Sequence, residues 1–564
     1  MNSTAERWGH APSWRDHAIG LGLCALYVAL LISTADSIGL GRDEGMYVDA
    51  ATRYAGWLET LFKAPSQALT QEAIDSAFVA NHEHPPLMKL LFGLGFLAQR
   101  EWQLFASDSQ SFRFAGMLSA GGLLWIIYLF GVRLYGRSAG AFAALSFALL
   151  PRPFYHAHLN AFDMPITCAS TLVLYNYYVA LERPRRTWLL GLTFGLALLT
   201  KHNSWFLPFM MLAHFGFCAL VEQKARKLGE PKRLSLAPWG LVAALGIGAS
   251  LFYAGWPWLW HDSWHRLRSY VSFHTHHEYY NMEYFGVNYF WPPFPMSYAW
   301  VMTLFTVPLT TLCLGIAGAA RATSMSLRLL RPLFTQSQTT DSAAPQAQLT
   351  AARPEPTQPT ALLLGALLTP LLVITLPTTP IFGGTKHWFT AYPFLALFSG
   401  RAFVEAAALV TAWSRWLPAA LASILLLPAA VETAHSHPFA LSYYTPIAGG
   451  VPGAAEKGMN RQFWGYTTRS LVPYLLEVMP NGGSLYICDT LYGSFQMLIR
   501  DGHLPPSFRA TPDISRADYA LVHHEKHFAE VDHQIWTTYR SVQPAHVLLY
   551  DGVPIISVYK NPKR

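Results

Sequence analysis

Charged residues are scarce in this chain of 564 residues. Asp, Glu, Lys and Arg make up 13% of it, against ~25% in soluble globular proteins, and hydrophobic residues make up 52%. Cysteine is also rare, and four of the five cysteines lie in apolar segments, so neither a disulfide framework nor a CxxC metal site is predicted. The net charge of +7 is split into short clusters between apolar segments, which argues against a nucleic-acid partner. The composition predicts an integral membrane protein.

Long apolar segments recur from residue 17 to about residue 432. A bilayer core of ~30 Å requires ~20 apolar residues per helix. We therefore expect an α-helical polytopic membrane protein with about eleven transmembrane helices. It would comprise a transmembrane domain at 1–432, with outer loops at 36–111 and 257–298, and a small α/β domain outside the membrane at 433–564. The candidate spans are 17–35, 112–132, 139–156, 164–181, 187–200, 204–221, 237–256, 299–320, 361–378, 388–410 and 416–432.

Clusters of Lys and Arg follow every second span, which predicts the orientation of the chain. By the positive-inside rule the side that carries these clusters is cytoplasmic. The N-terminus then lies in the cytoplasm, whereas residues 433–564 lie on the outer side. The basic residues are Arg7 and Arg15 before the first span, Arg133 and Arg137, Arg183, Arg185 and Arg186, Lys224, Arg226, Lys227, Lys232 and Arg233, and Arg321, Arg328 and Arg331.

The outer segments contain three further local patterns. Residues 87–97 are apolar but too few to span the bilayer, which favours an amphipathic helix on the outer surface. Residues 484–489 and 517–524 are predicted strands. Residues 546–560 are predicted to form a hairpin with Asp551-Gly552 in its turn, because Asp-Gly between apolar runs is typical of a tight hairpin turn.

Ionisable residues gather at the outer ends of the spans. Each has a plain structural interpretation: Asp163 as a helix cap, a surface lysine whose ammonium group reaches water, or a solvated loop acid. Their convergence favours function, because separate segments bring them to the same membrane surface. The candidates are Asp43, Glu44, Glu83, His84, Lys89, Asp163, Lys201, Lys386 and His387.

A carboxylate beside cationic groups at the membrane surface suits one chemistry well. A sugar could pass from a polyprenyl phosphate to a hydroxyl acceptor while the lipid tail stays in the bilayer. In this hypothesis Lys386 and Lys201, with His84, contact the phosphate. The carboxylate takes the proton of the acceptor.

The same residues resemble motifs of the GT-C membrane glycosyltransferases, and in particular the protein O-mannosyltransferases (glycosyltransferase family 39). Asp43-Glu44 is similar to an acidic pair in that family's first outer loop. Residues 84–89, His-Pro-Pro-Leu-Met-Lys, are similar to its His-Pro-Pro-Leu-x-Lys stretch. Residues 386–393 resemble a late basic-aromatic motif. The bacterial lipid A aminoarabinose transferases are also similar, although they have Lys where this chain has His84.

The resemblance implies an inverting glycosyl transfer in which Asp43 is the general base and Glu44 supports it. It implies a polyprenyl-phosphate-sugar donor, a protein, lipid or glycan acceptor, membrane lipid as a partner, and the bacterial inner membrane as location. No cofactor is firmly implied. A divalent metal is the one candidate, with Glu83 and either His265 or His274 as ligands.

Two other functions fit a membrane protein of this kind. A lipid-linked sugar flippase or secondary transporter would place ionisable groups near the middle of the bilayer. The inner parts of these spans are almost free of charge, which disfavours transport. A non-catalytic scaffold, with the tail as its binding module, is the third possibility.

Overall fold

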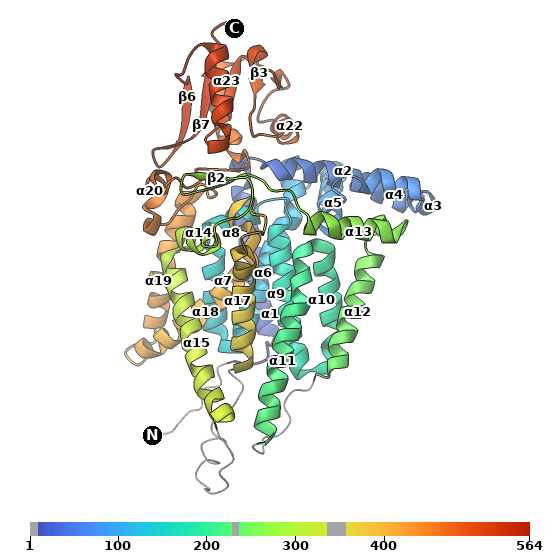
Figure 1. The fold of residues 1–564 in the computed structure, drawn as a ribbon, viewed down its shortest axis with the longest axis vertical. Coiled ribbons are helices and arrows are strands. Elements are labelled where there is room, and N and C mark those ends of the chain that lie inside the picture. The colour runs from blue at the N-terminus through green and yellow to red at the C-terminus, as the bar shows by residue number, and fades with distance from the viewer. Residues whose placement is uncertain (1–8, 228–235, 336–356) are drawn as a thin grey trace.

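The structure is a computed structural model that describes residues 9–227, 236–335 and 357–564. It is predominantly helical, with a small sheet near the C-terminus. Arg7, Lys232 and Arg233 of the predicted basic clusters lie outside the described residues. The helices form a bundle, and one end of it carries both the sheet and several helices that run across it (Figure 1). We call this end the sheet end.

Every predicted span coincides with a helix. The helices are α1 (Trp14–Thr34), α6 (Asp108–Tyr135), α7 (Arg137–Ala148), α9 (Asp163–Glu182), α10 (Thr187–Thr200), α11 (Phe206–Lys227), α12 (Pro238–Ala254), α15 (Leu309–Thr335), α17 (Thr357–Thr375), α18 (Tyr392–Thr411) and α19 (Leu417–Ser436). Two predicted spans are each divided in two, because Pro151 begins the short α8 (Pro151–Ala157) and Pro308 separates α14 (Tyr298–Thr306) from α15.

Six helical segments among the described residues are long and apolar enough to cross a membrane. They contain α1, α6, α11, α17, α18 and α19. Several other predicted spans are shorter than a bilayer requires: α7, α10 and α12 have 12, 14 and 17 residues. The chain is thus a multi-pass membrane protein whose helices differ widely in length.

Glycine allows close contact between helices in the centre of the bundle. A Cβ atom on Gly131 of α6 would lie 2.4 Å from the Cα atom of Gly140 in α7. Small residues at such crossings let two backbones approach, which is how helices pack where no water drives them together. Helix α6 has 17 buried residues among the 28 that the structure gives it, so it forms the core of the bundle.

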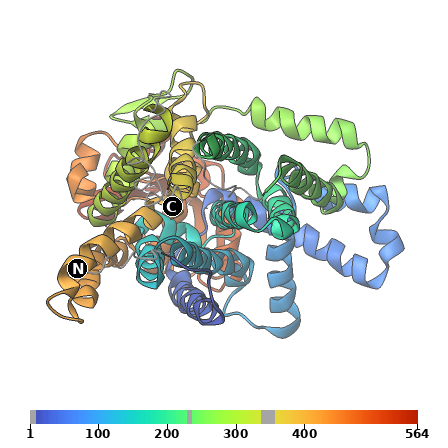
Figure 2. The ribbon, with the colours of Figure 1, turned by 90° about the horizontal axis from the view of Figure 1, so that it is seen from below.

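Amphipathic helices lie across the sheet end. They are α2 (Arg42–Lys63), α3 (Pro65–Ala68), α4 (Gln71–Phe78), α5 (Leu87–Trp102) and α13 (Ser263–Thr275). Figures 1 and 2 show α2, α4 and α13 at a steep angle to the bundle axis. Helix α5 covers the predicted surface helix at 87–97. A two-stranded hairpin, β1 (Met282–Tyr284) and β2 (Val287–Tyr289), follows α13.

The C-terminal sheet has five strands in the order β4-β3-β5-β7-β6. They are β3 (Gly483–Tyr486), β4 (Phe508–Ala510), β5 (Tyr519–His523), β6 (His546–Tyr550) and β7 (Val553–Lys560), with α20 (Gly450–Glu456), α21 (Val472–Val478), α22 (Tyr492–Arg500) and α23 (Ala529–Tyr539) around them. Both predicted strands and the predicted hairpin are confirmed. Asp551 and Gly552 have φ of 48° and 76°, the left-handed conformation that a tight hairpin turn needs.

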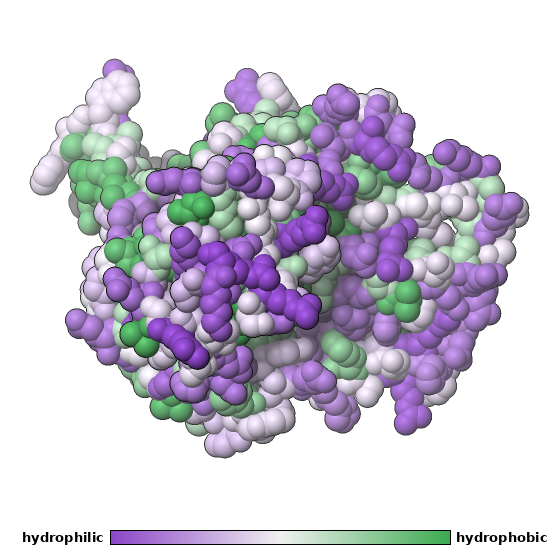
Figure 3. Space-filling model, turned by 90° about the horizontal axis from the view of Figure 1, so that it is seen from above, coloured by the Kyte–Doolittle hydropathy of each residue, from purple (hydrophilic) through white to green (hydrophobic). Residues whose placement is uncertain are grey.

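The two ends of the molecule differ in character. Figure 3 shows the sheet end, where hydrophilic residues dominate and a hollow lies beside the raised part of the surface. The C-terminal ends of α11 and α15, which carry Lys224 and Arg331, lie at the opposite end of the bundle (Figure 1). This arrangement agrees with the separation of charge on which the predicted orientation rests.

Candidate active site

A cavity of about 670 Å³ lies at the sheet end of the bundle. Its apolar part is formed by side chains of the long helices, among them Leu174, Met210, Met302, Val373 and Phe394. Its polar part is lined by residues from the loops and the C-terminal region. The charged and imidazole side chains are Arg42, Asp43, Glu83, His84, Arg152, Lys201, His202, His274, His277, Glu283, Lys386, His387, Glu525 and His527.

Six of the nine residues predicted from the sequence line this cavity: Asp43, Glu83, His84, Lys201, Lys386 and His387. Glu44, Lys89 and Asp163 do not. The structure therefore brings together side chains from five separate segments and places three predicted residues behind the wall.

Asp43 and Lys386 form an ion pair in the cavity wall. The Nζ atom of Lys386 lies 3.1 Å from Oδ2 of Asp43, and their side chains are 6% and 21% exposed. Asp43 is in the first turn of α2, where the helix dipole favours a carboxylate. The Lys386 ammonium lies 3.9 Å from the centroid of the Trp464 ring, so an aromatic face also holds the cation.

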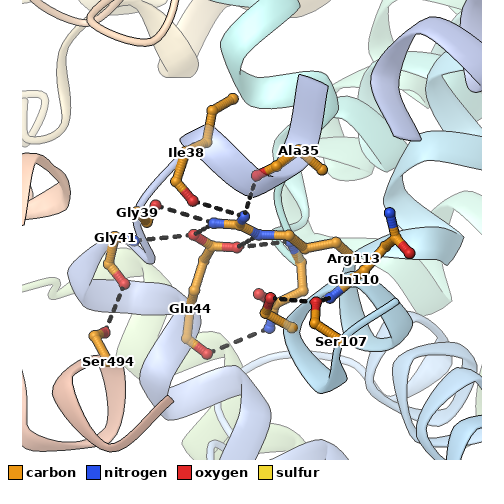
Figure 4. Close-up of polar contacts among 11 residues, drawn as sticks. Ala35, Ile38, Gly39, Gly41, Glu44, Ser107, Gln110, Arg113 and Ser494 are labelled. Carbon is orange, nitrogen blue, oxygen red and sulfur yellow. Dashed lines mark hydrogen bonds and ion pairs between the residues drawn. The ribbon is translucent and has the colours of Figure 1, made fainter. Parts of the chain in front are cut away.

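Glu44 points away from the cavity, although it is adjacent to Asp43 in sequence. Both of its carboxylate oxygens accept hydrogen bonds of 2.9 Å from Arg113, and both side chains are 2% exposed. Figure 4 shows that the Arg113 guanidinium also donates to the carbonyls of Ile38 and Gly39. Glu44 further accepts the backbone N–H of Gly41, which closes the start of α2. Its contacts are those of a structural residue.

Asp163 is also committed to a partner. It begins α9 and lies 2.7 Å from the Nζ atom of Lys201, which lines the cavity. His156 lies 3.8 Å from the other carboxylate oxygen. Asp163 therefore holds Lys201 in place from behind the cavity wall.

Lys89 holds the loop that precedes α5. It is fully buried, and its Nζ atom donates to the carbonyls of Asn81 (2.5 Å) and His84 (2.8 Å). Burial lowers the pKa of Lys89 to about 7, while Glu83 opposes that shift. The predicted substrate-binding role of Lys89 is replaced by a role in the position of His84 and Glu83.

His84, His202 and His274 form a cluster with ligand geometry. One ring nitrogen from each lies within 4.8 Å of the others, and the Nδ1 atom of each is buried without a hydrogen-bond partner. Burial lowers the pKa of His84 well below its usual range and that of His274 to about 4, so both imidazoles are neutral. Neutral imidazoles suit Zn²⁺. These three residues fit a metal better than Glu83 with His265, because His265 is exposed.

His387 is held by its own loop. Its Nε2 atom contacts both the carbonyl and the backbone N–H of Phe382, the latter at 3.2 Å. The Phe382 ring packs edge-on against it. His387 thus fixes the turn before Lys386 as well as lining the cavity.

The C-terminal region supplies side chains that the sequence patterns did not indicate. The Glu525 carboxyl contacts that of Asp489, and Asp489 contacts the guanidinium of Arg42. Burial raises the pKa of Asp489 to about 6, and burial beside Asp489 raises the pKa of Glu525 well above its usual range. Two carboxyls in contact cannot both ionise cheaply, so this pair holds a proton near neutral pH.

Arg152 is the other residue that the sequence reasoning missed. It lies inside the predicted span 139–156 and lines the cavity. A charged residue within an apolar segment is itself a signal of function, and that signal would have found it.

A bundle of apolar helices with a charged cavity at one end defines a membrane protein built to act on a substrate at the membrane surface. Residues 83–248 match the dolichyl-phosphate-mannose-protein mannosyltransferase family. The match confirms the predicted resemblance, and the chain is of the GT-C type of membrane glycosyltransferases.

Solved structures with similar chains are far apart from this one in sequence. ArnT from Cupriavidus metallidurans is 13% identical in the apo state, with a TM-score of 0.46 over 97% of this chain and 98% of that chain. ArnT bound to undecaprenyl phosphate gives 13% and 0.45, over 96% and 98%. The apo oligosaccharyltransferase of Archaeoglobus fulgidus gives 12% and 0.45, over 91% and 70%. No curated protein matches the sequence.

Proposed function

We propose that this protein transfers a sugar from a polyprenyl-phosphate donor to a hydroxyl acceptor on the outer side of a bacterial inner membrane, with inversion. The carrying observation is the Asp43–Lys386 pair in a cavity wall that is apolar on one side and cationic on the other. The family matched over residues 83–248 supports it by its description. The acceptor is a protein, lipid or glycan.

Each part of the cavity has a role in this proposal. The apolar side receives the first isoprene units of the donor. Cationic side chains hold the phosphate, and Asp43 faces the acceptor. The acceptor oxygen attacks the anomeric carbon, the bond from that carbon to the phosphate oxygen breaks, and the polyprenyl phosphate leaves. Asp43 takes the acceptor's proton.

The remaining predicted residues hold this arrangement. Glu44 and Asp163 position Asp43 and Lys201 through the contacts described above. In this proposal residues 1–432 form the catalytic transmembrane domain and residues 433–564 a periplasmic α/β domain. His84, His202 and His274 would hold a divalent metal, whose charge would add to the positive potential of the cavity.

The substitution Asp43→Asn tests the proposal. It preserves size and hydrogen bonding but removes the base, so turnover should fall by ~10²–10⁴-fold while donor binding persists. Asp49→Asn is the matched control, because Asp49 lies on the same helix with its side chain 63% exposed. The measurement is sugar transfer by purified protein from a polyprenyl-phosphate sugar. Full turnover in Asp43→Asn would contradict the role of Asp43, and transport of donor without transfer would favour a flippase.

A further inference from the structure

Arg152 is a buried cation without an acidic partner among the described residues. Its side chain is 1% exposed in α8 and makes one printed hydrogen bond, from Nη2 to the carbonyl of Tyr443 at 3.3 Å. The Tyr444 ring centroid lies 5.2 Å from its Cζ atom. The Nε and Nη1 atoms are buried and have no partner. A buried guanidinium in this condition is costly unless an anion completes it.

The other cations of the cavity already have carboxylate partners. Arg42 contacts Asp489, Lys201 contacts Asp163, and Lys386 contacts Asp43. Within the part of the chain that the structure describes, Arg152 is thus the cavity's one Arg or Lys with unsatisfied donors and no carboxylate. Because its donors face a cavity, the missing anion is a bound ligand.

A glycine turn leaves room beside this guanidinium. Gly383 and Gly384 have φ of 71° and 64°, a conformation that favours glycine. A Cβ atom on Gly384 would lie 3.4 Å from Nη1 of Arg152, and one on Gly383 would lie 2.8 Å from Nζ of Lys386. The turn therefore passes both cations, and its lack of side chains keeps the space next to each of them open.

We propose that Arg152, Lys386 and the Gly383–Gly384 turn form a binding site for a phosphate monoester, and that its source is the lipid-linked donor. This inference rests on the proposed function and makes it more specific. Arg152, rather than Lys201, supplies the main uncommitted charge. A guanidinium presents two parallel N–H donors to a phosphate, which a lysine paired with an aspartate does not.

Two lipids that differ only in the phosphate group test this site. The purified protein is titrated with undecaprenyl phosphate and with undecaprenol, by a change in its intrinsic tryptophan fluorescence or thermophoresis. Arg152→Gln should weaken binding of the phosphate lipid by about 10-fold or more, as expected for a lost charged hydrogen bond, and leave undecaprenol unaffected. Arg152→Lys should recover part of the loss. Arg53→Gln is the control, since Arg53 lies on α2 with its side chain 49% exposed.

A second pair of variants covers the case in which Arg152→Gln does not fold. Gly384→Ala places a methyl group 3.4 Å from Arg152 and should weaken phosphate binding. Gly502→Ala carries the same backbone strain at φ 77° with nothing within 4 Å of the new methyl, and should bind normally. Loss of binding in both variants would attribute the effect to strain and overturn the inference.

The outcomes separate this inference from the function on which it rests. If the unaltered protein binds undecaprenyl phosphate no better than undecaprenol, the proposed function fails. If it prefers the phosphate lipid and Arg152→Gln retains that preference, the function stands and the inference is overturned. A raised KM for the acceptor with unchanged phosphate-lipid binding would assign the anion to the acceptor and overturn the donor assignment.

Discussion

Asp43 and Glu44 are neighbours in the sequence but belong to different environments. Successive residues of a helix are about 100° apart around its axis, so one side chain faces the cavity and the other faces the core. Asp43 meets Lys386, whereas Glu44 meets Arg113. An acidic pair in a sequence therefore identifies the segment, and only the helix direction identifies which acid reacts.

The substitution Glu44→Gln should lower stability rather than chemistry. It leaves the Arg113 guanidinium buried without its charge partner, which typically costs about 3–5 kcal/mol. The measurement is thermal unfolding in detergent, together with turnover per folded molecule. Glu101→Gln is the control, because Glu101 also pairs with an arginine but its side chain is 57% exposed. A large drop in turnover at unchanged stability would instead place Glu44 in the reaction.

At the scale of elements, the C-terminal sheet region and the start of α2 are joined by direct contacts. The Ser494 hydroxyl of α22 donates to the carbonyl of Gly41 at 3.1 Å, and the backbone N–H of Arg42 donates to the carbonyl of Trp464 at 2.9 Å. The Arg42–Asp489 ion pair lies beside them. The residue that precedes Asp43 is therefore held from the C-terminal region, so the position of Asp43 depends on that contact.

This contact should weaken as pH rises from about 4 to about 6. The pKa of Asp489 is about 6 in the folded protein, raised by burial from 3.8, so the folded state binds that proton more tightly than the unfolded state. Its contribution to stability is complete below pH 4 and is lost as pH rises through 6. Arg42, Asp43 and Glu525 are the charged groups that face it.

Comparison of the unaltered protein with Asp489→Asn isolates this effect. The stability difference between them should change across that pH range by at most about 3 kcal/mol, since each pKa unit corresponds to 1.36 kcal/mol. Thermal unfolding at pH 4, 5, 6 and 7 is the measurement. Parallel curves for the two proteins would show that Asp489 does not titrate there.

Sequence reasoning was effective for the elements and less so for the site. Apolar segments of sufficient length and the Asp-Gly turn are local signals, and the structure has a helix or hairpin at each. Asp43 and Lys386 were found because each follows a local motif at a membrane surface. Glu525 was not, because its place in the cavity depends on how the sheet region packs, which no local pattern encodes.

At the scale of the whole molecule, the charge pattern and the fold give the same polarity. The sheet end is hydrophilic and carries the cavity, and the basic ends of α11 and α15 lie opposite (Figures 1 and 3). The positive-inside rule places those ends in the cytoplasm. The cavity then opens toward the other compartment.

Fusions of alkaline phosphatase test this polarity, because the enzyme is active only outside the cytoplasm. A fusion after Arg564 should be active, and a fusion after Lys227 should be inactive. A green fluorescent protein at the same positions should give the opposite pattern. A fluorescent fusion after Arg564 would place the cavity in the cytoplasm and contradict the proposed location.

The Asp43–Lys386 ion pair has a consequence for the order of substrate addition. While the lysine neutralises the aspartate, the carboxylate is a weak acceptor of protons. A donor phosphate competes for the same ammonium group and would free the carboxylate as it binds. We therefore expect a sequential reaction in which the donor enters first, so that the protein arms its base only when a sugar is present to be transferred.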